Sequence, residues 1–289
     1  MATYSRISLN NIINSIERAK ADRPIESIFL EQLEASIEKT ELKNARPPSK
    51  TYKPSGMNCM RACFYTILGM PAAPDTRSAS LTGICESGTD RHIRIQKALE
   101  AMKDNGYDLE YIDVETYIKT HNLEDRLVVV SKEGMETKLY MPELNMSFMT
   151  DGIIKFRGIY YIFEFKTEIP NKFYKRTGVD PAHYTQGIAY SCAFDIPDVL
   201  FLYENRATCE HKPYRFTVTE DMKAERIYNF ISDCNSYIEN RTVPPLPIDQ
   251  NIIKKCKYCA YKALCASHGV GNNVVIDIPN CEEDSDGEK

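Results

Sequence analysis

The sequence predicts a mixed α/β fold in which a central β-sheet is flanked by helices. Helical patterns stand before, between and after a run of mostly antiparallel strands. The hairpin over residues 151–167 carries apolar side chains on both faces, which is typical of strands covered on two sides. The 289-residue chain is 43% hydrophobic, enough for a sizeable core. These observations indicate one α/β core with helical additions.

The expected elements follow in chain order. Isoleucines and leucines recur at helical spacing over residues 8–43, interrupted at Pro24, and a proline-rich connection that cannot be continuous helix follows over 46–56. Further helices are expected at 59–69, 88–104, 181–194 and 220–239. Strands are expected at 127–130, 138–141, 146–156, 159–167, 199–203 and 215–219.

The hairpin places two carboxylates opposite each other. A tight turn centred on Arg157 and Gly158 pairs Asp151 with Glu164, counting outward, and puts Lys166 on the same face. Directly opposed residues have Cβ atoms roughly 4.5–5.5 Å apart, where like charges repel. A lone Glu-x-Lys is commonly a structural pair at a sheet edge, but a divalent cation would relieve this opposition. The pattern therefore predicts a metal-dependent active site.

Net charge excludes few functions here. The chain carries −5, but its last nine residues hold five acids and one lysine, which leaves about −1 on the rest. This acidic, aromatic-free tail is expected to be disordered. No stretch approaches the ~18 apolar residues of a membrane span, and the N-terminus lacks a signal-peptide apolar core. We expect an intracellular protein that does not enter membranes.

Three of the ten cysteines have the spacing of a metal or cluster site. The trio Cys256-x-x-Cys259-x5-Cys265 needs a fourth ligand to make a closed four-cysteine site. In an intracellular chain, disulfides are not expected. Six others have no such spacing and are expected to be buried or incidental thiols: Cys63, Cys85, Cys192, Cys209, Cys234 and Cys281.

Other polar residues are ordinary when taken alone. Gln186 and Tyr190 lie four apart and share one face of their helix, while His92 lies in the first turn of another. Between the hairpin and the 181–194 helix lies a basic stretch with two aromatics, expected either to contact DNA or to be a solvated loop. Its candidate DNA-binding residues are Lys172, Tyr174, Lys175 and Arg176.

The order of these residues resembles a known superfamily. Four motifs follow one another: Gly88-x-x-x-His92, Asp151, Glu164-x-Lys166 and Gln186-x-x-x-Tyr190. They resemble the PD-(D/E)XK nuclease superfamily, specifically its RecB-like branch of phage exonucleases and CRISPR-associated nucleases. The resemblance covers roughly residues 53–265, with Thr150 where the superfamily name has proline. It implies a restriction-endonuclease-like core.

The resemblance also implies roles for these residues. Asp151, Glu164 and the Phe165 carbonyl would bind Mg²⁺ or Mn²⁺, with His92 as an additional ligand. Lys166 would orient or activate water, and Gln186 and Tyr190 would position DNA. The chemistry agrees, because oxygen ligands suit these hard ions, and a bound ion lowers the pKa of its water and screens the phosphate.

A second part of the resemblance concerns the cysteines. In RecB-like nucleases with iron–sulfur clusters, one N-terminal cysteine joins a C-terminal trio spaced in this way. The string Cys59-Met-Arg-Ala-Cys63-Phe-Tyr is similar to the usual Cys-Pro-Arg-x-x-Tyr, which favours Cys59 over Cys63. The resemblance implies a structural [4Fe–4S] cluster on Cys59, Cys256, Cys259 and Cys265. Zn²⁺ is the alternative occupant, since four cysteines suit both.

The leading functional hypothesis is a metal-dependent DNA exonuclease acting at single-stranded ends in viral recombination, replication or genome processing, in the host cytoplasm. Two alternatives remain open. One is an endonuclease or CRISPR-adaptation nuclease on the same site, and the other is a non-catalytic four-cysteine DNA-binding or assembly protein. The expected organisation is a helical extension over 1–50, a nuclease domain over 51–270 and an acidic tail over 271–289.

Overall fold

The computed structural model describes residues 23–44, 49–73, 77–133, 136–247 and 256–269. The start of the expected N-terminal helix, the acidic tail and Cys281 lie outside these residues. The chain divides into two compact units, one from Met1–Arg46 and Pro74–Ser87 and the other from Pro47–Ala73 and Gly88–Lys289. All the candidate site residues belong to the second unit.

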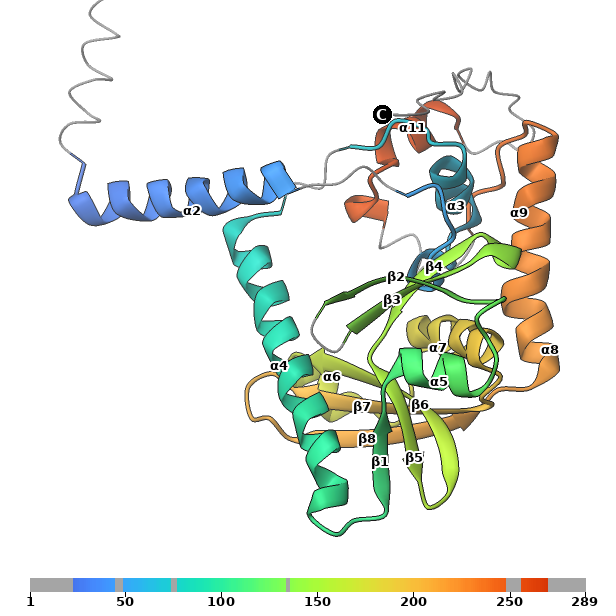
Figure 1. The fold of residues 1–289 in the computed structure, drawn as a ribbon. Coiled ribbons are helices and arrows are strands. Elements are labelled where there is room, and N and C mark those ends of the chain that lie inside the picture. Colours follow the sequence, from blue (N-terminus) through green and yellow to red (C-terminus); the bar gives the residue numbers. More distant parts are fainter. Residues whose placement is uncertain (1–22, 45–48, 74–76, 134–135, 248–255, 270–289) are drawn as a thin grey trace, which may run out of the picture. The chain divides into compact units, whose positions relative to one another are not determined.

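A five-stranded sheet forms the centre of the second unit (Figure 1). Its order is β1 (Leu109–Ile112), β5 (Gly152–Phe156), β6 (Ile159–Glu168), β7 (Asp198–Asn205) and β8 (His211–Thr217). Strands β6 and β7 run parallel, and the other neighbours run antiparallel. The predicted mixed sheet flanked by helices is confirmed, and it is consistent with a restriction-endonuclease-like α/β core. Strand β1 was not predicted.

A smaller antiparallel sheet contains β2 (Val128–Glu133), β3 (Glu136–Met141) and β4 (Met146–Thr150). The single strand expected over 146–156 was wrong, because β4 and β5 belong to different sheets and the chain leaves both at Asp151. The φ of Gly152 is +141°, and a Cβ there would meet the Tyr111 hydroxyl at 2.4 Å. A glycine at this position therefore permits the break between the sheets.

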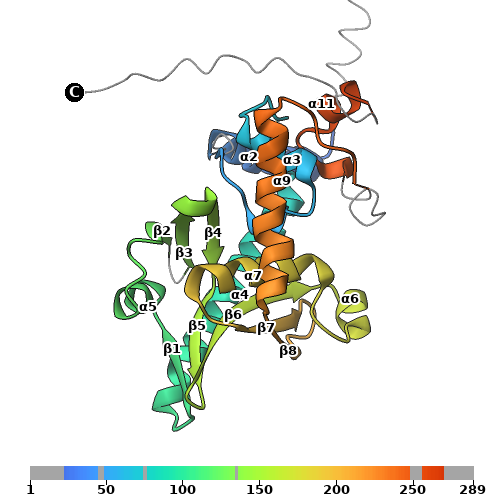
Figure 2. The ribbon, with the colours of Figure 1, turned by 90° about the vertical axis from the view of Figure 1, so that its right-hand side faces the viewer.

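The described helices mostly follow the predicted pattern. They are α2 (Ile25–Asn44), α3 (Met60–Ile67), α4 (Ala79–Asp104), α5 (Val114–Thr120), α6 (Pro170–Lys175), α7 (Pro181–Phe194), α8 (Glu220–Lys223), α9 (Asn229–Glu239) and α11 (Lys262–Ser267). A π-helical turn joins α8 to α9, which packs against α3 (Figure 2). Helix α7 has the predicted bounds because Pro181 starts it and the Asp180 side chain accepts the Ala182 N–H. Helix α5 was not predicted. Helix α4 begins at Ala79 and not at the predicted residue 88, so His92 lies inside this helix and not in its first turn.

The predicted hairpin register is confirmed. Strands β5 and β6 pair Phe156 with Ile159 and Gly152 with Phe163, where the ladder ends. Asp151 lies one residue beyond the ladder, and its carboxylate accepts the N–H of Phe165, the residue after Glu164. The turn residues Arg157 and Gly158 have φ of 51° and 79°. Two positive φ values in succession match the twist of the flanking strands.

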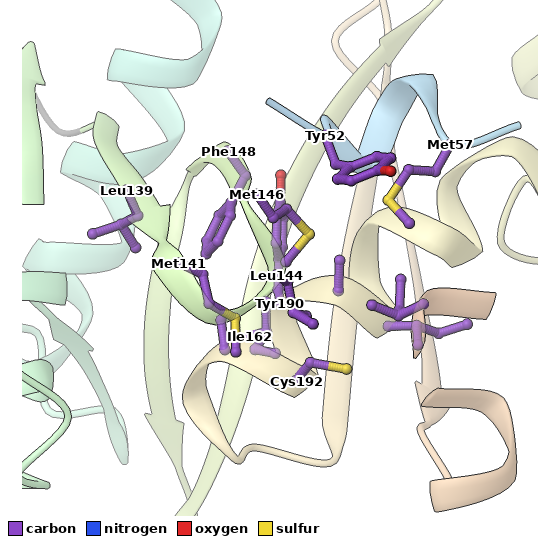
Figure 3. Packing of buried hydrophobic residues seen from close by; sticks show 14 of the residues in the cluster. Tyr52, Met57, Leu139, Met141, Leu144, Met146, Phe148, Ile162, Tyr190 and Cys192 are labelled. Atoms are coloured by element: carbon purple, nitrogen blue, oxygen red, sulfur yellow. The ribbon is translucent and has the colours of Figure 1, made fainter. Parts of the chain in front are cut away.

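Both faces of the hairpin are buried, as predicted. Ile153 and Ile162 belong to the main apolar cluster, part of which Figure 3 shows, whereas Ile154 and Phe163 belong to a second cluster with Ile95 of α4. Burial on both faces excludes water from the end of the hairpin where Asp151 and Glu164 lie. Within the described part of the chain, no helix has the length and apolarity that crossing a membrane requires.

Candidate active site and cysteine cavity

Asp151 is fixed by contacts on its backbone and on both side-chain oxygens. Its carbonyl accepts hydrogen bonds from Gln96 Nε2 and from the Tyr111 hydroxyl, each at 2.7 Å. Its Oδ2 accepts the Phe165 N–H at 2.7 Å, and its Oδ1 lies 2.9 Å from His92 Nδ1. Because Asp151 lies between two sheets, side chains from α4 and β1 replace the ladder partners that a strand residue would have.

Glu164 is buried near Asp151, and the described residues give a partner to only one of its two oxygens. Its Oε1 accepts from Lys166 Nζ at 2.5 Å and from Gln186 Nε2 at 2.8 Å. Its Oε2 is buried and has no hydrogen-bond partner among the described residues. A buried carboxylate oxygen with no partner is costly, and a bound cation would remove that cost. The residues present therefore fit a divalent metal.

The electrostatics of the pair agree with this fit. Burial, together with the Asp151 carboxylate, raises the pKa of Glu164 to about 7. Burial lowers the pKa of the Lys166 ammonium, but the carboxylates of Glu164 and Asp151 outweigh that effect and raise it overall. Burial also lowers the pKa of His92, but the hydrogen bond and the charge of Asp151 outweigh burial and raise this pKa overall. Lys166 is therefore cationic at neutral pH, while two adjacent carboxylates resist simultaneous ionisation.

The glutamine and tyrosine of α7 have different positions. Gln186 is half-buried and donates to both Glu164 and the Tyr190 hydroxyl, the latter at 2.7 Å. Tyr190 is fully buried, and its hydroxyl donates to the Met149 carbonyl at 2.5 Å. Tyr190 thus holds Gln186 in place, and Gln186 is the member of the pair that a substrate can reach.

Glu136, at the start of β3, was not singled out by the sequence. Its Oε1 lies 3.8 Å from His92 Nδ1, and the ligand atoms of His92, Glu136 and Asp151 lie within 4.8 Å of one another. Pairing of β3 with β4, which sets Thr137 against Thr150, brings Glu136 beside Asp151. A single glutamate in a strand carries no local signal of this role.

His183, in the first turn of α7, is a second residue that the sequence analysis did not identify. Its ring stacks on the rings of Phe201 and Tyr203. On the parallel neighbour β6, those two residues pair with Glu164 and Lys166. The ring therefore lies over the strand next to the catalytic candidates. Its spacing three residues before Gln186 was the available signal, since the two share a helix face.

The surroundings of His183 keep its ring neutral. The Tyr203 hydroxyl accepts the Asp180 N–H at 3.0 Å and lies within hydrogen-bond distance, 2.9 Å, of His183 Nδ1. Burial, and next the Lys166 ammonium, lower the pKa of His183 to about 4. The ring is a neutral N–H donor at neutral pH.

The expected basic loop is the short helix α6 followed by Arg176, and its residues separate into two groups. The Arg176 side chain is 6% exposed and pairs with Glu168 and with Asp180 at 3.0 Å. Its guanidinium is thus committed to buried ion pairs and is not available to a phosphate. Lys172 is exposed but pairs with the same two acids, and Tyr174 and Lys175 are exposed on α6.

A second site gathers the cysteines. A cavity of about 270 Å³ is lined by Cys59, Cys256, Cys259 and Cys265. Burial raises the pKa of the Cys59 thiol, and the other three thiols raise it further. Cys63 is buried outside this lining, with its thiol 3.5 Å from the Gly56 carbonyl. The cavity thus contains the four predicted cysteines and favours Cys59 over Cys63.

Comparisons with known proteins find distant structural similarities. No protein-family model matches the chain, and no curated protein matches it. The solved structure of SSO0001 is similar at 15% identity, covering 84% of this chain and 98% of that one, with a TM-score of 0.40. The solved structure of LHK-Exo in complex with dAMP is similar at 11% identity, covering 67% of this chain and 92% of that one, with a TM-score of 0.32. Similarities at this level assign no function.

Proposed function

We propose that this protein is a divalent-metal-dependent deoxyribonuclease of the RecB-like, PD-(D/E)XK kind, acting as an exonuclease at single-stranded DNA ends. One observation carries the proposal: the two carboxylates of Asp151 and Glu164 are buried, a lysine pairs with Glu164, and one Glu164 oxygen has no partner within the described residues. A structural Glu–Lys pair does not require a second buried carboxylate, whereas clustered carboxylates are typical ligands of hard divalent cations.

The proposed ligands are Asp151, Glu164, His92 and the Phe165 carbonyl, with Glu136 added from its proximity to His92 and Asp151. Oxygen donors with one imidazole suit Mg²⁺ and Mn²⁺. When bound, such an ion supplies an acidified water and a charge that screens the scissile phosphate.

The chain's own side chains have supporting roles in this proposal. Lys166 adds a cationic donor for the phosphate or the attacking water. Gln186, itself held by Tyr190, keeps Glu164 oriented toward the site. His183 offers a neutral N–H that does not compete with a cation, because its pKa lies well below neutral. The exposed residues of α6 near the end of β6, Tyr174 and Lys175, are the remaining candidates for DNA contact.

We propose that the cysteine cavity holds a structural [4Fe–4S] cluster. All four cysteines of the predicted set line this cavity of about 270 Å³. Four cysteines can hold either a [4Fe–4S] cluster or Zn²⁺, and the spacing of the C-terminal trio, which resembles that of iron–sulfur RecB-like nucleases, supports the cluster.

Digestion of end-labelled DNA tests the catalytic proposal. Wild-type protein is incubated with 5′- and 3′-labelled single- and double-stranded DNA and with covalently closed circles, in Mg²⁺ and in Mn²⁺. We expect progressive shortening of linear single strands, no cleavage of circles, and no activity in Glu164→Gln. Glu143→Gln, the same change at an exposed position, should retain full activity. Binding without cleavage in either metal would instead favour the non-catalytic alternative, and cut circles would favour an endonuclease.

A further inference from the structure

Arg61 lies beside the cysteine cavity and is almost completely buried. It follows Cys59 by two residues at the start of α3, is 1% exposed and lines the cavity. Its Nε donates to the Pro244 carbonyl at 2.7 Å, and its Nη1 donates to the Gly269 carbonyl at 2.8 Å. The same Nη1 lies 3.6 Å from Cys265 Sγ, within reach of an N–H···S hydrogen bond.

Among the described residues, no carboxylate pairs with Arg61. No ion pair joins Arg61 to an acidic side chain in the described ranges, and its Nη2 is buried without a hydrogen-bond partner there. A guanidinium remains charged at any physiological pH, so this burial is costly unless an anion lies nearby. Within the described part of the chain, the anionic candidates beside Arg61 are the cysteine sulfurs, because thiolates are the form in which cysteine binds metal.

We infer that Arg61 is the counter-charge and sulfur hydrogen-bond donor of the group held in the cysteine cavity. The inference rests on the proposed cluster and adds a residue that the cysteine spacing does not identify. Four thiolates give a [4Fe–4S] centre a net negative charge, which the guanidinium offsets. Hydrogen bonds to the sulfurs and local positive charge both raise the reduction potential of such a centre. Arg61 therefore both retains the cluster and sets its potential.

The test uses the full-length protein purified anaerobically. Iron, sulfide and zinc are first measured in the wild type. The midpoint potential of the cluster and the rate at which a chelator removes it are then measured in the wild type, in Arg61→Gln and in Arg61→Lys. We expect Arg61→Gln to shift the potential to a more negative value and to lose its cluster several-fold faster. Arg61→Lys should fall between it and the wild type, because it keeps the charge but not the fork of donors.

The matched control is Lys262→Gln. Lys262 also lines the cavity but is solvent-exposed, so water screens its charge and its loss should leave the potential close to that of the wild type. A wild-type potential in folded, cluster-containing Arg61→Gln would overturn the inference, as would equal shifts in Arg61→Gln and Lys262→Gln. Neither result would affect the nuclease proposal, which digestion of DNA tests separately.

The Arg61 variants lose two hydrogen bonds to backbone carbonyls. If they do not fold, a measurement on the wild type tests whether Arg61 contacts the cluster. Protein labelled with ¹⁵N at arginine alone is reduced, and pulsed electron paramagnetic resonance is used to detect coupling between the cluster electron spin and ¹⁵N. Coupling supports the inference, and its absence overturns it. Stoichiometric zinc without iron would overturn the proposed cluster together with this inference, while leaving the catalytic site untested by that result.

Discussion

Two carboxylates at the end of one hairpin determine when this site can bind a cation. Without a metal, burial and the neighbouring Asp151 raise the pKa of Glu164 to about 7. His92 likewise has a raised pKa, because burial, which lowers it, is outweighed by Asp151. Both groups must lose a proton before they can act as ligands.

Metal affinity should therefore increase with pH up to and slightly above 7. Below that pH, binding must displace protons from Glu164 and His92, so we expect affinity to rise roughly tenfold or more per pH unit and then to level off. Lys166 keeps its proton throughout this range. Calorimetric titration of Mn²⁺ in buffers of different ionisation enthalpy measures the protons released. Glu164→Gln should release about one proton fewer than the wild type, and equal release would contradict the assignment.

At the residue scale, the site residues that lie on one hairpin could be predicted from the sequence. Those brought to the site by pairing or packing of distant segments could not. The closeness of Asp151 and Glu164 follows from a tight turn and the two-residue period of strands. Glu136 and His183 depend on the pairing of β3 with β4 and on the stacking of α7 over β7. Arg176, which has the chemistry of a DNA-binding residue, is buried because Glu168 and Asp180 surround it.

At the element scale, the junction of β4 and β5 positions the site. This junction could not be predicted, because apolar residues stand on both sides of it and Asp-Gly alone does not show that two sheets separate there. In contrast, the bounds of α7 were predictable from the capping aspartate and the first-turn proline. Strand β1 and helix α5 are short and were missed.

Gly152→Ala should damage the junction. An alanine Cβ would displace the Tyr111 hydroxyl, which holds the Asp151 carbonyl, and would be strained at φ +141°. We expect a loss of about 1–3 kcal/mol in the free energy of unfolding and a roughly 10–100-fold weaker affinity for Mn²⁺. Gly88→Ala is the matched control, since nothing lies within 4 Å of its Cβ in helix α4. It should gain about 0.5–1 kcal/mol instead. Urea unfolding and Mn²⁺ titration distinguish the two, and wild-type affinity in Gly152→Ala would contradict the role of Tyr111.

The attachment of α4 to the sheet is a second element-scale feature. Glu204 at the end of β7 is completely buried and pairs with Arg91 and Arg94, which flank His92 on α4, and with His211 at 2.9 Å. Burial raises the pKa of Glu204, but the hydrogen bonds from these arginines outweigh it and lower it overall. The pairs thus stabilise the fold above the ordinary pKa of a glutamate, and this stability is lost as pH falls.

Glu204→Gln should weaken that attachment and displace His92. The arginines are 22% and 48% exposed, so water partly compensates, and we expect a loss of roughly 1–3 kcal/mol in the free energy of unfolding at neutral pH. Mn²⁺ affinity should fall as well. Chemical unfolding at pH 7 and at pH 4 measures the effect, which should be smaller at pH 4. An equal loss at both pH values would contradict an ionic role.

At the scale of the whole molecule, the cysteine cavity joins parts of the chain that lie about two hundred residues apart in the sequence. The C-terminal trio was evident from its spacing, and the choice of Cys59 over Cys63 came from a resemblance. The quoted Cys-Pro-Arg-x-x-Tyr pattern includes Arg61, but its burial and its contacts with Pro244 and Gly269 depend on the folded chain and could not be predicted.

Cys59→Ser should remove the cluster and lower the melting temperature by several degrees, because a tie between distant segments is lost. Cys63→Ser, the matched control, should keep both the iron and the visible absorbance of the wild type, since Cys63 lies outside the cavity lining. Iron analysis and thermal unfolding measure the two effects. Iron retained in Cys59→Ser but lost in Cys63→Ser would show that the fourth ligand is Cys63.

The central claim is that Asp151 and Glu164 hold a catalytic cation. The most direct measurement is single-turnover cleavage of an end-labelled single-stranded oligonucleotide across a Mn²⁺ titration, with DNA binding measured in parallel. We predict saturable, Mn²⁺-dependent cleavage by the wild type and a loss of at least about a hundredfold in Asp151→Asn and in Glu164→Gln, with DNA binding retained. Undiminished Mn²⁺-dependent cleavage by either variant would contradict the claim.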